Sequence, residues 1–239
     1  INAVKNSLFP INPINGKRHF TLFSRSFDKF VGDKIVFPLL HLNSWSTKQC
    51  IPHSKQKMQT CIDTVVDKLL DHNRELLLPE GQESFTYKMH TLAGTQCNAY
   101  ALMGGNMVVF SELIKEIAES LETSDITHTT VCFADDTKAT VNLEGLKIED
   151  VLGALIGHEM THIASRHSVH LLVESIARTL LHFTLDSEDV TGSLLSYFTS
   201  RKREIESDIT GCYLSYKAGY DPRGALYLQE LFASSTSPK

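Results

Sequence analysis

The 239-residue sequence predicts an α+β fold that is mostly helical and contains a small mixed sheet. Apolar residues recur at helical spacing in three long stretches, at residues 55–78, 148–165 and 194–218. Short stretches of alternating polarity lie between the first two and predict strands. The composition is that of an ordinary globular protein, because 42% of the residues are hydrophobic and 21% are charged. We therefore expect one domain at residues 51–239, with no internal repeat.

Residues 1–50 are expected to form an extended lead-in that packs on this domain. Their polarity is mixed and shows no sustained period, and short strands are expected at residues 19–23 and 34–37. The helical pattern that starts at Lys55 is expected to end at Pro79, Glu80 and Gly81, which disfavour a helix.

The middle of the chain predicts the sheet. Residues 85–92 read as a strand, and residues 98–103 and 106–110 read as a hairpin that turns at Gly104 and Gly105. Ser111 is placed to cap the helix that follows. Residues 122–147 are polar and rich in turn formers, with one β-like run at residues 129–133.

The last third of the chain predicts more helix. A helix over residues 148–165 is followed by an amphipathic stretch at residues 169–185, which the polar residues 186–192 interrupt. The helix over residues 194–218 is expected to stop at Gly219 and Asp221-Pro222.

Charge and cysteine usage exclude several classes of protein. The net charge of -5 provides no basic field for nucleic acid, so we expect no nucleic-acid partner. The five cysteines form no CxxC pair, which argues against a zinc ribbon and for reduced, mostly buried thiols. No apolar run approaches the roughly 20 residues that span a bilayer. The chain starts at Ile1, so it reads as a soluble mature form or fragment, and any membrane association would depend on missing segments.

The segment from Gly157 to His162 is an HExxH motif inside a helical pattern. Histidines at i and i+4 lie one turn apart on one helix face, so His158 and His162 can reach a single metal ion. Glu159 lies to one side of them, where its carboxylate can take the proton of an attacking water. The alternative is a solvated polar face, but the apolar residues that precede the motif favour a core helix.

A catalytic zinc usually has three protein ligands, so a third must come from elsewhere. The metzincin pattern would need His at position 168 and Gly at position 165, but both are Ser. Glu204 and Asp208 share a face of the last long helix, so one can ligate the ion while the other orients a ligand histidine. Glu206 falls on a different face and is expected to be solvated.

These motifs resemble the gluzincin family of the CAAX prenyl endopeptidases, HtpX proteases, periplasmic BepA and the mitochondrial Oma protease. The glutamate helix of that family reads approximately SR-x-x-E-x-x-A-D. Ser200, Arg201, Glu204 and Asp208 match it, and Ser207 replaces the alanine.

Two further segments carry the resemblance. Residues 98–105 look like the family's NA-F-A-x-PGG hairpin, with Met103 in place of proline. Residues 12–18 look like the N-P-x-T-G-[RK]-[RK] segment of the Oma/BepA branch, with Asn15 in place of threonine. The resemblance covers about residues 12 to 232. The Oma/BepA branch fits better than the prenyl proteases, which span the membrane several times.

The resemblance implies a zincin-like fold with a catalytic helix, a glutamate helix and an active-site edge strand. It implies one Zn²⁺ per chain, held by His158, His162 and Glu204, with Glu159 as the base and Asp208 behind a ligand histidine. The strand after Gly105 is expected to form the edge of the cleft, where an extended polypeptide adds as a further strand near Asn98 and Ala99.

The implied function is that of a zinc metalloendopeptidase that cleaves misfolded or membrane-associated proteins, in the bacterial cell envelope or at the mitochondrial inner membrane. The alternative is a latent or chaperone-like peptide-binding protein that keeps its zinc. The intact Glu159 favours the enzyme, because a purely structural zinc site needs no base.

Weaker signals remain open. Arg201, Arg203 and Tyr213 are candidates for stabilising the oxyanion. His167 reads as a helix cap or surface residue rather than a ligand, and Cys97 as a buried thiol rather than a zinc contact. Residues 170–197 could form a helical hairpin beside the cleft, a lid or a membrane-contacting element. In a latent enzyme, His182 or a residue within 186–193 could occupy the fourth zinc position.

Overall fold

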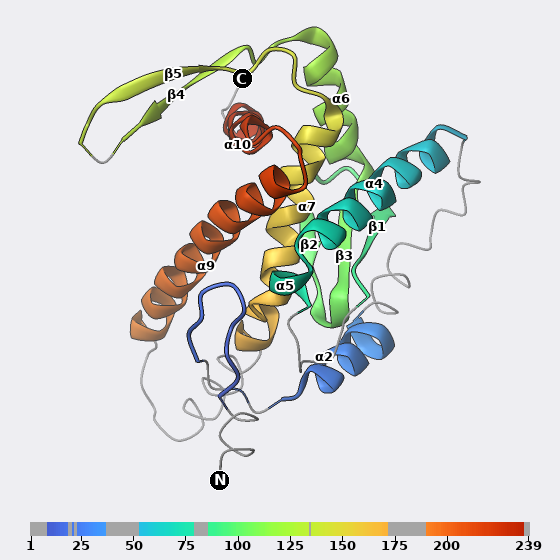
Figure 1. Ribbon diagram of the computed structural model, residues 1–239, viewed down its shortest axis with the longest axis vertical. Coiled ribbons are helices and arrows are strands. Elements are labelled where there is room, and N and C mark those ends of the chain that lie inside the picture. The colour runs from blue at the N-terminus through green and yellow to red at the C-terminus, as the bar shows by residue number, and fades with distance from the viewer. Residues whose placement is uncertain are drawn as a thin grey trace.

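A computed structural model describes most of the chain (Figure 1). The described residues are 9–18, 21, 23–36, 53–78, 86–133, 135–171 and 190–236. The helices among them are α2 (Arg25–Val31), α4 (His53–His72), α5 (Arg74–Leu77), α6 (Ser111–Thr123), α7 (Ile148–Ala164), α9 (Val190–Lys217) and α10 (Arg223–Thr236). The strands among them are β1 (Lys88–Leu92), β2 (Ala99–Ala101), β3 (Asn106–Phe110), β4 (His128–Cys132) and β5 (Lys138–Asn142). The predicted α+β fold, mostly helical, is confirmed.

The first sheet is mixed, as predicted. Its strand order is β1-β3-β2, with β3 parallel to β1 and antiparallel to β2. The hairpin between β2 and β3 turns through a short 3₁₀ segment, Met103–Gly105, where Gly104 has a φ of 83° and Gly105 a φ of 91°. Only glycine adopts such angles without strain, which explains the Gly-Gly pair.

The edge of this sheet differs from the expectation. The strand after Gly105 was expected to be the edge of the cleft, but that strand is β3, and β3 is paired on both sides. The edge strands of this sheet are β1 and β2, and β2, the strand before the glycines, is the one that lines the cleft. The short β2 also contacts α7, so it is β2 that borders the HExxH helix.

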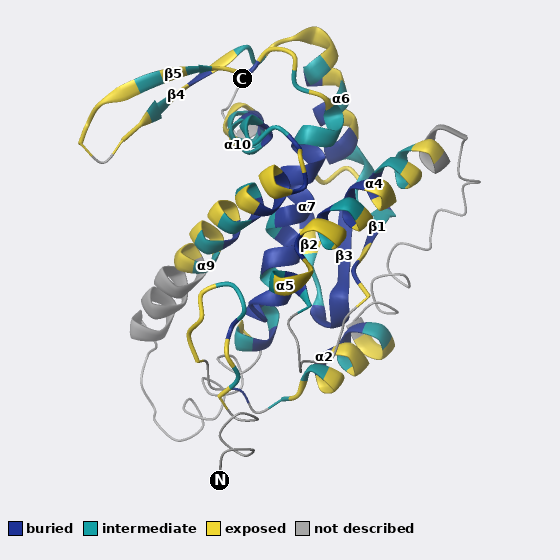
Figure 2. Ribbon diagram, in the orientation of Figure 1, coloured by how far each residue is buried: buried dark blue, intermediate teal, exposed yellow. Residues whose placement is uncertain are grey.

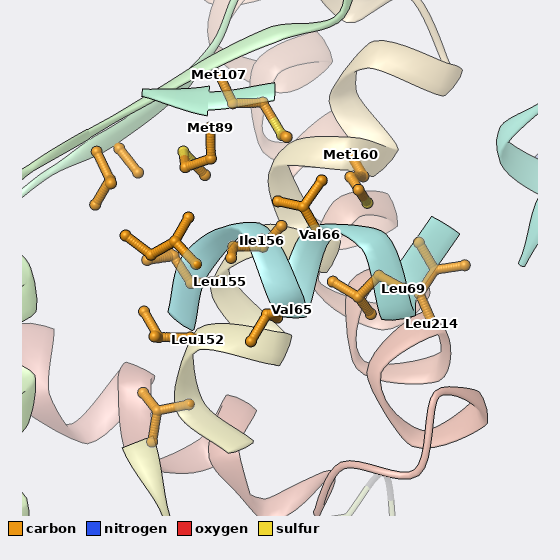
Figure 3. Close-up of a cluster of buried hydrophobic side chains, with 14 of the residues drawn as sticks. Val65, Val66, Leu69, Met89, Met107, Leu152, Leu155, Ile156, Met160 and Leu214 are labelled. Atoms are coloured by element: carbon orange, nitrogen blue, oxygen red, sulfur yellow. The ribbon is translucent and has the colours of Figure 1, made fainter. Parts of the chain in front are cut away.

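The core surrounds α7, which lies between the first sheet, α4 and α9 (Figures 1 and 3). Apolar side chains of α7 point toward α4 and the sheet, where they meet methionines of β1 and β3 (Figure 3). The labelled members of this cluster are Val65, Val66, Leu69, Met89, Met107, Leu152, Leu155, Ile156, Met160 and Leu214, all of them buried. The sequence pattern of α7 is thus explained by burial on nearly every side.

The helix predicted over residues 55–78 is interrupted once. It divides at Asn73 into α4 and α5, before the expected stop at residues 79–81, which lie outside the described residues. Asn73 is fully buried, and its side-chain amide donates to the carbonyl oxygens of Leu69 at 2.8 Å and Leu214 at 3.1 Å. The break therefore ties α4 to α9.

The N-terminal lead-in is less extended than expected. Residues 25–31 form α2, and the Ser24 hydroxyl caps it by accepting from the Phe27 amide at 3.1 Å. Residues 32–36 form a π-helical segment, so the strand expected over residues 34–37 is wrong. Backbone hydrogen bonds that continue from α2 hold the start of this segment, as Gly32 donates to Asp28 and Lys29. The strand expected at residues 19–23 falls mostly outside the described residues.

Two elements were not predicted. The β-like run at residues 129–133 is half of a hairpin, β4–β5, whose strands pair from His128↔Asn142 to Cys132↔Lys138 and extend away from the body (Figure 1). The helix α10 follows Asp221-Pro222, where the last helical pattern was expected to end. The amphipathic stretch predicted over residues 169–185 lies outside the described residues after Leu171, as do His182 and residues 186–189. None of the described helices combines the length and the apolar character needed to cross a membrane.

Candidate metal centre

The site forms where α7 and α9 touch backbone to backbone. Gly157 on α7 faces Gly211 on α9, and a Cβ added to Gly211 would lie 2.5 Å from the backbone nitrogen of His158. Only two glycines permit so close an approach. Their contact brings the glutamate helix directly beside the HExxH motif, so that Glu204 and Asp208 reach the histidines.

Three side chains form a group that could hold a metal ion. Ligand atoms of His158, His162 and Glu204 all lie within 4.8 Å of one another. The two Nε2 atoms are 3.0 Å apart, and the Glu204 carboxylate lies 3.3 Å from Nε2 of His158 and 3.6 Å from Nε2 of His162. Zinc bonds of about 2.0–2.1 Å in tetrahedral geometry separate two ligand atoms by roughly 3.3 Å, so this donor set fits zinc.

The outer nitrogens of both histidines are occupied. Asp208 Oδ1 lies 2.8 Å from Nδ1 of His158, and Nδ1 of His167 lies 2.9 Å from Nδ1 of His162. Each histidine is therefore left with Nε2 facing Glu204. Outer partners of this kind fix the orientation and the tautomer of a metal-binding histidine.

The electrostatics of the group favour a positive charge at its centre. Burial, the largest single influence, lowers the pKa of His158, but hydrogen bonds to Asp208 and Glu204 outweigh it and raise the pKa to about 10. Hydrogen bonds from His158 and His162 hold the pKa of Glu204 far below its usual range.

Glu159 neighbours the group formed by His158, His162 and Glu204 but is not one of its members. Its side chain is buried, with 6% of the residue exposed, and burial raises the pKa of its carboxyl, partly offset by the charges of His158 and His162. The backbone N–H of Ala101 on β2 bonds to this carboxylate. A carboxylate with a raised pKa next to a metal site suits proton transfer.

A cleft of about 590 Å³ opens over these residues. Its lining includes the edge strand β2 and the preceding Asn98, so the candidate substrate contacts Asn98 and Ala99 lie at the cleft. It also includes Leu228 and Phe232, members of a stripe on α10 that sequence reasoning missed. Residues at i, i+3, i+4 and i+7 form one helix face. The cleft-lining members of that face are Ala225, Leu228, Gln229 and Phe232.

The structure brings together some predicted residues and not others. His158, Glu159, His162, Glu204 and Asp208 all line the cleft, together with the candidate substrate contacts on the edge strand. The three oxyanion candidates, Arg201, Arg203 and Tyr213, do not. Tyr213 follows Glu204 by nine residues, which at about 100° per residue places it on the opposite side of α9.

Two of the weaker candidates, Cys97 and His167, lie among the described residues, and the expectation for His167 changes. Cys97 does not line the cleft, and a hydrogen bond to Glu116, the largest influence, raises the pKa of its thiol to about 11. His167 is neither a cap nor a surface residue, because it is 4% exposed and contacts His162. Burial, followed by the nearby charges of His162 and Arg203, lowers the pKa of His167 to about 3.

Glu206 is not simply solvated. Its side chain is 21% exposed, and its Oε1 atom accepts hydrogen bonds from Asn15, Asn12 and Ser165. Two of those donors belong to the N-terminal turn and lie more than 190 positions away in the sequence. Helical periodicity describes only one helix at a time, so it carries no signal of such a contact.

The chain is similar to known metallopeptidases. The sequence model of peptidase family M48 matches residues 56–238. The chain is 25% identical over 166 residues to the mitochondrial metalloendopeptidase OMA1 of Schizosaccharomyces pombe, covering 66% of this chain and 41% of that protein. It is 27% identical over 135 residues to the mitochondrial metalloendopeptidase OMA1 of Arabidopsis thaliana, covering 54% and 22%. The matched region is thus less than half the length of either relative.

Proposed function

The chain belongs to peptidase family M48, and we propose that it is a zinc-dependent endopeptidase whose zinc is held by His158, His162 and Glu204. Membership of the family makes it a metallopeptidase that acts on polypeptides. The observation that carries the finer proposal is the closeness of the ligand atoms. The two Nε2 atoms lie 3.0 Å apart, Oε2 of Glu204 lies 3.3 Å from Nε2 of His158, and Oε1 of Glu204 lies 3.6 Å from Nε2 of His162. The one zinc ion per chain would act as a Lewis acid toward the scissile carbonyl and the attacking water.

The protein's own residues supply the proton transfer. Glu159 lies buried at the floor of the cleft, where its carboxylate takes a proton from the attacking water and passes it to the leaving amine. The raised pKa of this carboxyl favours that double role, because the group must both accept and release a proton near neutral pH. Asp208 keeps the His158 ring oriented through its 2.8 Å contact with Nδ1.

The substrate is proposed to bind as an extended strand along β2. That strand pairs with β3 along one edge, and residues 98–101 line the cleft. Unpaired backbone groups at a sheet edge can pair with an extended peptide, which gives affinity without demanding a particular sequence. Ala101 already directs its N–H toward Glu159, so a peptide on this edge would pass the base.

The apolar wall of α10 supports a role in protein quality control. Leu228 and Phe232 line the same cleft as the edge strand β2 and Leu155 of α7. Misfolded chains expose apolar side chains that folded proteins bury, and these side chains would pack against the apolar residues of α10. We propose cleavage of misfolded or membrane-associated proteins in mitochondria, since both relatives carry the name mitochondrial metalloendopeptidase.

Zinc content and cleavage of casein by the wild type and Glu159→Gln test the proposal. Both proteins are expected to bind one zinc per chain, while Glu159→Gln loses about 10²–10⁴-fold in rate, the contribution of a positioned base. Glu149→Gln makes the same change on the same helix but outside the cleft, and should cleave like the wild type.

Two other outcomes would redirect the proposal. Zinc in every variant without cleavage in any would favour the latent or chaperone-like alternative. A wild type that binds no zinc would contradict the metal assignment itself.

A further inference from the structure

His167 folds back onto the metal group from just beyond the end of α7. The chain turns at Arg166, which has a left-handed φ of 58°, and this turn sends the next side chain toward His162. The two rings meet edge to face, with centroids 4.8 Å apart and planes at 81°. Their Nδ1 atoms are 2.9 Å apart, close enough for a hydrogen bond.

The direction of that hydrogen bond follows from the position of the metal group. If Nε2 of His162 binds zinc, the single proton of the neutral ring is on Nδ1, and His162 donates it. Nδ1 of His167 must then accept, which places the proton of His167 on its own Nε2. That atom faces Glu206, whose Oε2 lies 3.8 Å away.

The two oxygens of Glu206 have different surroundings. Oε1 accepts from the Asn15 amide at 2.9 Å, from the Ser165 hydroxyl at 3.3 Å and from the Asn12 amide at 3.4 Å. These three donors fix the carboxylate, and Oε2 is the oxygen turned toward His167.

The turn that supplies two of those donors is itself well braced. Asn12 donates its backbone N–H to the Lys17 carbonyl at 2.8 Å, and Gly16 donates to the Asn12 carbonyl at 2.9 Å. The Asn12 side chain also accepts from the Ile14 amide at 2.8 Å. In Figure 1 this dark blue loop lies beside the ends of α7 and α9.

We propose that His167 and Glu206 form a positioning pair that orients the His162 imidazole for metal binding, and that the turn at residues 12–18 holds Glu206 in place. The proposal rests on the zinc assignment given above. Each ligand histidine then has a carboxylate behind it, because Asp208 orients His158 directly and Glu206 orients His162 through His167. It also gives a role to the N-terminal turn, which no other part of the mechanism uses.

His167→Leu and His167→Asn separate this role from packing. Leucine fills similar space without an acceptor, whereas the asparagine amide can place its oxygen near the former Nδ1 position. His167→Leu is expected to weaken zinc binding by about 10–100-fold, the range for loss of an outer partner of a ligand. His167→Asn should recover most of that loss. His72→Leu, at an exposed histidine on α4, is the matched control.

The measurements are zinc affinity by competition with a chelator, the visible spectrum of the cobalt-substituted protein, and urea unfolding of the metal-free protein. The cobalt spectrum of His167→Leu should shift, because the geometry of His162 at the metal changes. A merely structural role would lower the stability of the metal-free protein while leaving that spectrum unchanged.

The outcomes are distinguishable. If the wild type binds zinc and His167→Leu binds it equally well with the same cobalt spectrum, the positioning role is wrong and the zinc assignment stands. If His167→Asn is as weak as His167→Leu, the acceptor role is wrong. A wild type without zinc would overturn both proposals. Should His167→Leu fail to fold, Glu206→Gln replaces it, and a zinc affinity equal to that of the wild type would contradict the pair.

Discussion

The two helices that build the site differ sharply in how they are held. α7 is buried at 12 of its 17 positions, so its two histidines are placed by packing on nearly all sides. α9 presents one face to solvent, where Ile209 is 68% and Tyr216 is 65% exposed (Figure 2). The comparison teaches that α7 supports the fold on nearly all its sides, whereas α9 supports the fold and the site through its inner face alone, where Leu214 is buried.

This difference gives a ranking of substitutions by their cost to the metal-free protein. Changes that touch α7 should lower the free energy of unfolding, and equivalent changes on the exposed face of α9 should not. The contact between Gly157 and Gly211 is the exception, because there the two helices share one packing surface. Four predictions test the ranking, from the largest expected effect on the unfolding free energy to the smallest.

The largest effect is expected at the ion pair beyond the end of α7. Arg166 donates to both oxygens of Asp28, at 2.7 and 2.8 Å, and both side chains are buried. Asp28→Ala leaves the arginine charge buried without its carboxylate, which should cost about 3–5 kcal/mol. The matched pair on α9 is Lys217 with Glu75, which is exposed and screened by solvent, so Glu75→Ala should cost far less. Urea unfolding measures both, and equal costs would break the comparison.

The second prediction uses the same side chain on both helices. Ile156 on α7 is 1% exposed and Ile209 on α9 is 68% exposed. Ile156→Ala should lower the unfolding free energy by about 2–5 kcal/mol, because it removes buried methylene groups and leaves a cavity. Ile209→Ala should change it by no more than about 0.5 kcal/mol. A large loss from Ile209→Ala would show that the outer face of α9 is covered in solution.

The same contrast explains what the sequence could predict. α7 was predicted in place, because residues such as Leu152 and Ile156 mark a buried helix, and the role of the motif within it stays a prediction. The glutamate helix was predicted from the i, i+4 pair of Glu204 and Asp208. Both signals are local, and the spacing of residues within one helix can be read from the sequence without knowledge of the fold.

The failures are of the opposite kind. Glu206 and His167 were misplaced because their partners lie on other elements, and spacing within one helix cannot show them. α10 was missed although its apolar stripe forms a wall of the cleft, since the pattern was expected to end at Asp221-Pro222. The choice of β2 rather than β3 as the edge strand at the cleft depends on pairing with β1, which is a long-range contact.

The third prediction tests the surface that the two helices share. A Cβ in Gly211→Ala would lie 2.5 Å from the nitrogen and 2.8 Å from the Cα of His158, and neither backbone atom can yield. The helices must separate, at a cost of about 1–3 kcal/mol. Because His158 and Glu204 lie across this seam, zinc affinity should fall as well. Ile209→Ala, two residues away, should change neither the unfolding free energy nor the zinc affinity. A wild-type zinc affinity in Gly211→Ala would contradict the claim that the contact between Gly157 and Gly211 positions the ligands.

The smallest effect on the fold is expected where the effect on the site is greatest. The Glu204 side chain is 52% exposed and lies within ion-pair distance of His158 and His162. Glu204→Ala should therefore change the unfolding free energy of the metal-free protein by less than about 1 kcal/mol. Zinc affinity should nevertheless fall by more than the roughly 10–100-fold typical of an outer partner, because a direct ligand is lost. Zinc bound at wild-type affinity would refute the assignment of Glu204, whereas a large loss of stability would show that α9 supports the fold more than its exposure indicates.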